Sequence, residues 1–72
     1  MPDQLDTSAV KIIEIKGVST ESFEDAVDTA VSKAAESING IISVEVVRQT
    51  GSVEDGRIVR YESTVKLSFT VR

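Results

Sequence analysis

The stretch SFEDAVDTAVSKAAESIN, residues 22–39, repeats apolar side chains at helical spacing. The apolar positions follow one another at steps of three, one and four residues: Phe23, Ala26, Val27, Ala30, Val31, Ala34 and Ile38. This spacing gathers them on one face and predicts a single amphipathic helix over Ser22–Asn39. Ser22 is a favoured capping residue, Asp25 three positions later resembles a capping box, and Gly40 suits a helix end. A helix with one apolar face needs another layer to cover it.

Three strand-like segments supply that layer. The first is Val10–Lys16, ended by Gly17, and the second is Ile41–Gln49. A loop over residues 50–56 then leads to the third, Arg57–Arg72, which alternates apolar and polar residues. The order strand, helix, strand, strand predicts an α+β fold, β-α-β-β. A right-handed crossover makes the first two strands parallel, and the third lies between them, antiparallel to both, in the order 1-3-2.

The alternation assigns the two faces of this sheet. We expect the helix to pack on the face that carries Ile13, Ile15, Val44, Val46, Tyr61, Val65, Leu67 and Phe69. The other face keeps the apolar residues Ile12, Ile41, Val47 and Ile58 without cover. A chain of 72 residues without cysteine has a marginal core and no disulfide to support it. The sequence therefore predicts that the uncovered face is a subunit interface.

Composition excludes several classes of function. Residues 1–9 are polar and acidic and are interpreted as a flexible tail, and residues 10–72 as one domain. A net charge of −4 argues against nucleic-acid binding, and the basic residues of the second half are interpreted as solvated: Arg48, Arg57, Arg60, Lys66 and Arg72. No segment has the length of a membrane span, and no signal pattern opens the chain. The lack of cysteine fits a reducing compartment, and we expect a cytoplasmic protein.

The chain offers few groups for catalysis. It has no histidine or cysteine and no serine in a nucleophile-elbow pattern, so a non-enzymatic role is predicted. Glu45 and Glu62 share the outer face, and acid–base work by this pair is the remaining catalytic alternative. Carboxylates crowd the helix start and the hairpin, at Glu21, Glu24, Asp25 and Asp28 and at Glu54 and Asp55. They have no EF-hand spacing, so a solvated acidic surface is expected and a cation site is the alternative.

Five local segments, taken jointly, resemble the dodecin family. They are Ile13-Glu14-Ile15 before Gly17, the segment GVSTESFEDA at 17–26, Val44-Glu45-Val46-Val47, Glu54-Asp55-Gly56, and Tyr61-Glu62 followed by VKLSF at 65–69. The similarity spans Val10–Val71. It implies twelve subunits that meet around two-fold and three-fold axes in a hollow homo-dodecamer, which commonly binds flavins.

The resemblance also points to site residues. Flavin-binding members stack a tryptophan from the second strand on the isoalloxazine ring, and a glutamine of the third strand bonds its polar edge. These positions are Ser43, close to Glu45, and Glu62. Ser43 has no π surface, and an ionised Glu62 donates no hydrogen bond, so the usual flavin mode is weakened.

The hypotheses from the resemblance concern a binding particle. We expect an assembly for small-molecule binding, storage or sequestration, with a flavin (FMN, riboflavin or FAD) or a divalent cation as candidate ligands. The alternatives are a flavin-less shell with a structural or cation-binding role and a monomeric adaptor that adds a strand or helix to a partner.

Overall fold

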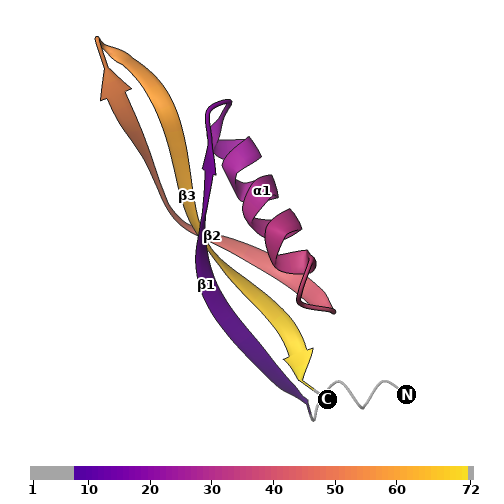
Figure 1. The fold of residues 1–72 in the computed structure, drawn as a ribbon. Helices are drawn as coiled ribbons and strands as arrows, with labels where there is room; N and C mark the ends of the chain where they lie inside the picture. The colour runs from indigo at the N-terminus through magenta and orange to yellow at the C-terminus, as the bar shows by residue number, and fades with distance from the viewer. Residues whose placement is uncertain (1–7, 72) are drawn as a thin grey trace.

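Three strands and one helix make up the fold of the computed structural model, which describes residues 8–71. They are β1 (Ala9–Ser19), α1 (Phe23–Ala35), β2 (Ile41–Glu54) and β3 (Arg57–Val71). β3 lies between the other strands and is antiparallel to both, in the order β1-β3-β2, with α1 on one face (Figure 1). The predicted β-α-β-β topology is therefore confirmed. Residues 1–7 of the predicted tail lie outside the described residues.

The predicted cap of α1 is present. The Ser22 hydroxyl accepts a hydrogen bond from the backbone N–H of Asp25 at 2.9 Å, which satisfies one of the free donors of the first turn. The predicted end at Asn39 is wrong, because the helix stops at Ala35. Gly40 has a φ of +79°, which lets the chain turn back into β2. Ile38 still packs against the core from beyond the helix end.

The core is small and lies between α1, β1 and β3. Its buried apolar residues are Ala26, Ala30, Ala34, Val65 and Leu67, and Ile13 and Ile15 pack against it. Alanines on the buried face let the helix approach the sheet closely. A Cβ built on Gly17 lies 1.9 Å from the carbonyl oxygen of Ala26, so only glycine fits there. The prediction that Gly17 ends the first strand is wrong, because β1 continues through Gly17 to Ser19.

β2 departs most from the predicted faces. Val44 and Val46 stay 43% and 47% exposed, because α1 lies mainly over β1 and β3. Ile41, predicted on the outer face, instead pairs with Phe69 and packs against the core. The physical reason is a pair of β-bulges, between Ile41 and Ser43 and between Val46 and Arg48, each of which shifts the alternation.

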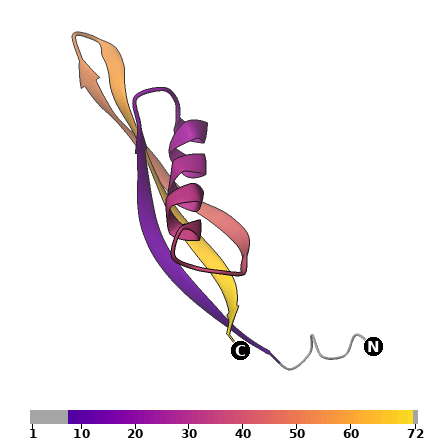
Figure 2. The ribbon, with the colours of Figure 1, turned by 45° about the vertical axis from the view of Figure 1, so that its right-hand side comes forward.

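The β2–β3 hairpin is longer than predicted. The loop predicted over residues 50–56 is mostly strand, and the turn is only Asp55-Gly56, with φ values of 53° and 75°. Positive φ at both central residues is the pattern of a type I′ turn, which matches the twist of the strands. The hairpin projects past the start of α1 and gives the chain extents of 56 × 20 × 16 Å (Figures 1 and 2). Val53, Ile58 and Val59 are exposed on this projecting arm.

Candidate functional site

The candidate site lies on the outer face, defined as the face of the sheet opposite α1. Val65 and Leu67 are buried against the helix, so the alternating residues of β3 between and around them face outward. The register places side chains from all three strands in rows on this face. From one end, the rows are Ile12–Ser68–Ser43, Glu14–Lys66–Glu45, Lys16–Thr64–Arg48 and Val18–Glu62–Thr50.

The three site residues predicted from the sequence lie on this face but in different rows. Glu45 pairs with Lys66, four positions along β3 from Glu62, and Ser43 pairs with Ser68, six positions away. At about 3.3 Å per residue, Glu62 lies roughly 13 Å from the row of Glu45 and roughly 20 Å from that of Ser43. Paired catalytic carboxylates of glycosidases stand about 5–9.5 Å apart. The predicted acid–base pair of Glu45 and Glu62 therefore does not form within the chain.

Glu62 is held by two cations. Its carboxylate accepts a hydrogen bond from Lys16 Nζ at 3.1 Å and forms an ion pair with Arg60 Nε at 3.2 Å. Its side chain is only 19% exposed. The hydrogen bond from Lys16 keeps the pKa of Glu62 below its ordinary value of 4.5, and the charges of Lys16 and Arg60 act in the same direction. Glu62 is therefore ionised and already engaged at neutral pH.

Among the crowded carboxylates at the start of α1, Asp25 has a structural role. The Ser19 hydroxyl donates to Asp25 Oδ2 at 2.7 Å and accepts from the backbone N–H of Glu21 at 2.8 Å. Asp25 thus fixes the connection from β1 to α1. Within residues 8–71, no three carboxylates lie close enough together to hold a metal ion.

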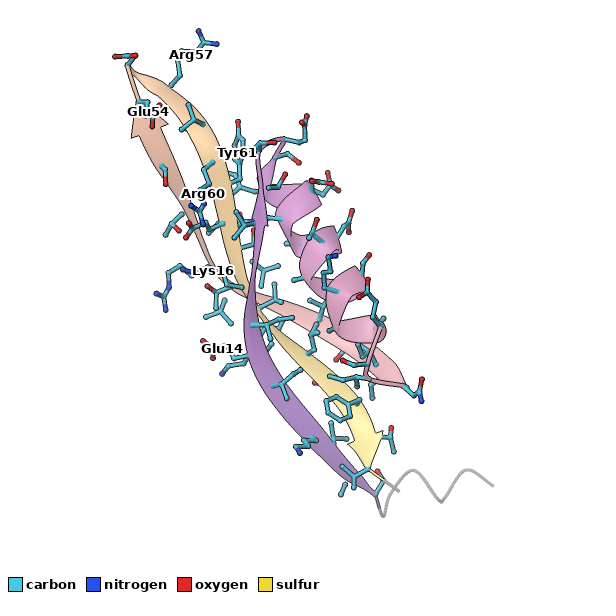
Figure 3. The ribbon with its side chains drawn as sticks, in the orientation of Figure 1. Glu14, Lys16, Glu54, Arg57, Arg60 and Tyr61 are labelled. Carbon is cyan, nitrogen blue, oxygen red and sulfur yellow. The ribbon has the colours of Figure 1, made fainter. Side chains whose placement is uncertain are left out.

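Sequence reasoning missed a depression on the outer face. Its volume is about 310 Å³, and it is lined by Glu14, Ile15, Lys16, Arg48 and Thr64. Figure 3 shows Glu14 and Lys16 projecting from β1 on the side away from α1. Only the register brings residues from three strands together here, so no local pattern in the sequence signals the depression. A bulge adds to the difficulty, because it alters which face Arg48 occupies.

Two of the aromatic residues pack against each other. The rings of Phe23 and Tyr61 meet edge to face, with centroids 5.0 Å apart at 87°. Both residues are half-buried and lie outside the buried core, in which the sequence had placed them. The hydroxyl of the buried Ser63 donates to the Phe23 carbonyl oxygen at 3.0 Å and accepts from Gln49 Nε2 at 3.3 Å. This network fixes the start of α1 on the sheet.

One helix on a sheet in the order β1-β3-β2, with a charged outer face, defines a class of small β-α-β-β proteins. The chain belongs to the dodecin family, whose family model matches residues 9–72. It is 32% identical to the calcium dodecin of Mycobacterium tuberculosis over 65 residues. This match spans 90% of this chain and 92% of the relative. Within residues 8–71, no helix has the length and apolar character that crossing a bilayer requires.

Solved structures agree with this assignment. The dodecin from Streptomyces coelicolor superposes with a TM-score of 0.86 at 25% identity and covers 100% of this chain and 97% of that one. The crystal structure of the M. tuberculosis calcium dodecin superposes with a TM-score of 0.78 at 32% identity and covers 90% of this chain and 93% of that one. That protein is described as calcium chelating, with a novel calcium-binding site. A Thermus thermophilus protein gives 0.87 at 21% identity, with 92% and 97% covered, which shows a common fold.

Proposed function

We propose that this chain is the subunit of a hollow homo-dodecamer that binds, stores or sequesters a small molecule. The observation that carries the proposal is the balance of exposed and buried apolar groups. In the described part of the chain, residues 8–71, eleven large hydrophobic side chains are exposed, whereas the buried apolar core consists of three alanines, one valine and one leucine. A core of this size leaves a domain marginally stable, so neighbouring copies are needed to cover the remaining apolar surface. Membership of the dodecin family, known for self-assembly and for binding rather than catalysis, supports this role.

The proposed binding surface is the outer face with Ser43, Glu45 and Glu62. Ser43 and Glu62 lie in rows roughly 20 Å apart. A small ligand that contacts a Ser43 and a Glu62 at the same time therefore takes them from two copies of the chain. Ser43 offers no ring for stacking, and Glu62 forms ion pairs with Lys16 and Arg60. A flavin bound here, whether FMN, riboflavin or FAD, therefore lacks the stacking and donor contacts of the family's usual mode.

Native mass spectrometry of the protein as purified tests the assembly. We expect a species of twelve 7.8 kDa chains, together with the mass of any retained ligand. A subunit that remains monomeric at micromolar concentration refutes the proposal and favours an adaptor role. Titration with riboflavin tests the flavin version: fluorescence that stays unquenched at saturating protein rejects it while leaving the assembly intact.

A second candidate function is a flavin-less shell that binds a cation. The observation that favours it is the relationship, at 32% identity, to a protein named calcium dodecin. Because no cluster of three carboxylates forms within residues 8–71, the proposed cation site combines acidic side chains of neighbouring copies. Thermal unfolding with calcium and with a chelator tests this: a higher melting temperature with calcium supports the site, and identical melting curves exclude it. A cytoplasmic location stays a prediction.

A further inference from the structure

We propose that the depression on the outer face binds an oxyanion, the phosphate or carboxylate group of a small molecule, through Lys16, Thr64 and Arg48. This deepens the proposed function and rests on it, because it names the ligand class of the outer face. Thr64 on β3 pairs with Lys16 on β1 and with Arg48 on β2, so the three residues form one row across the sheet. They line the depression of about 310 Å³ together with Glu14 and Ile15.

The row supplies the donors that an oxyanion requires. Adjacent strands lie about 4.8 Å apart, so the backbones of Lys16 and Arg48 stand roughly 10 Å apart with Thr64 between them. Their long side chains span this distance from both sides. The row thus combines an ammonium, a guanidinium fork and a hydroxyl, and charge-assisted hydrogen bonds of this kind are the strong ones.

The β-bulge between Val46 and Arg48 is what places the guanidinium in the row. In an unbroken strand, Arg48 shares the face of Val46 and points to the side of α1. The register shift after Val46 instead pairs Arg48 with the outward-facing Thr64. Bulges of this kind commonly re-aim a side chain beside a binding site. Here the bulge adds a second cation to a row that otherwise holds one.

The surrounding charges leave the two cations differently engaged. Both ion pairs found within residues 8–71 are made by Glu62, with Lys16 and with Arg60. Lys16, which lines the depression, is thus already paired with Glu62. Arg48 takes part in neither pair and keeps its donors for a ligand.

Three carboxylates bear on the anion. Glu62 already holds Lys16, and Glu14 and Glu45 lie in the neighbouring row. Glu14 lines the depression and opposes an anion, but it directly faces Lys66 across the strands, and Lys66 also faces Glu45 in the same row. The net charge of −4 disfavours a polyanion, so we expect a small ligand with a single anionic group.

Calorimetric titration of the assembled protein tests the proposal with two probes, inorganic phosphate and malonate, at low ionic strength in a chloride buffer. We expect saturable binding of at least one probe, with one site per subunit. Arg48→Gln weakens binding about tenfold, the loss of one charge-assisted contact at an exposed site. Thr64→Val keeps the shape and strand propensity of the side chain and weakens binding several-fold.

Arg57→Gln is the matched control. It removes the same charge at the turn end of the hairpin arm, far from the row (Figure 3), and should leave the affinity unchanged. Absence of saturable binding of both probes overturns the inference, as does an equal loss in the Arg48 and Arg57 variants. Native mass spectra of the same samples separate the two proposals. Dodecamers that bind neither probe refute the oxyanion site alone, whereas monomers that bind a probe refute the assembly alone.

Discussion

Replacing Gly17 by alanine tests how closely α1 must approach β1. The added methyl carbon lies 1.9 Å from the Ala26 carbonyl oxygen and 3.0 Å from Ala30 Cβ. Ordinary contact begins near 3.4 Å, so the helix and strand have to separate by about 1.5 Å in a close-packed interior. The nearest atom belongs to the helix backbone, so no side chain can rotate out of the way.

The cost of Gly17→Ala follows from this separation. Overpacking a core costs about 1–3 kcal/mol, and more when backbone has to shift. The separation also weakens the packing of the helix alanines on Val65 and Leu67, which form the rest of the buried core. We expect a loss of about 3 kcal/mol, a large share of the roughly 5 kcal/mol that stabilises a small domain. If folding is linked to assembly, part of the loss appears as dissociation at low concentration.

Urea unfolding followed by circular dichroism, at one fixed subunit concentration, measures this loss. Gly40→Ala is the control, because Gly40 has a φ of +79° and no atom within 4 Å of an added Cβ. Its cost is the left-handed backbone alone, about 1 kcal/mol. The reasoning fails if Gly17→Ala unfolds at the wild-type urea concentration, or if it is no more destabilising than Gly40→Ala.

Three further predictions concern the polar network and the outer face. Ser63→Ala removes the buried hydroxyl bonded to the Phe23 carbonyl and should cost about 1–2 kcal/mol in urea unfolding; a cost within error of zero contradicts this role. The pKa of Glu62 is lowered in the folded state by Lys16, so its contribution to stability is present above pH 4.5 and disappears as the pH falls below that value. Below pH 4.5, the stability of Glu62→Gln should consequently fall less steeply with decreasing pH than that of the wild type. Parallel stability curves would show that the contact with Lys16 does not lower the pKa of Glu62. Ser43→Trp adds a stacking surface at the proposed flavin position and should quench riboflavin fluorescence more than the wild type does; equal quenching would show that the lack of a ring at Ser43 is not what limits flavin binding.

Local patterns predicted most of the architecture. The apolar stripe from Phe23 to Ile38 and the cap at Ser22 gave the position and start of α1, because both depend on residues within one or two turns. The Asp55-Gly56 pair marked the hairpin, since a type I′ turn needs positive φ at both positions. The strand order followed from chain connectivity and handedness. These features need no knowledge of distant contacts.

The faces of β2 could not be predicted in the same way. Strict alternation places Ile41 outward and Arg48 inward. The bulge after Ile41 instead leaves this residue on the side of α1, and the bulge before Arg48 turns that residue outward. No residue type in this strand marks the bulges. The row of Lys16, Thr64 and Arg48 depends on this register, and so does the separation of Glu45 from Glu62. Site residues that lie on different strands are therefore recognised only once the pairing is known.

The exposure of β2, which α1 hardly covers, links the proposed assembly to the proposed oxyanion site. α1 lies mainly over β1 and β3, so Val44 and Val46 stay exposed on the side of the helix, while Ser43 and Arg48 lie on the outer face. β2 is thus an edge strand with apolar groups open on one side and the candidate ligand residues on the other. A neighbouring copy that buries the valines also restrains the strand that carries Arg48. Ordering that strand before the ligand arrives lowers the entropic cost of binding, so the assembled protein should bind the oxyanion more tightly than an isolated subunit.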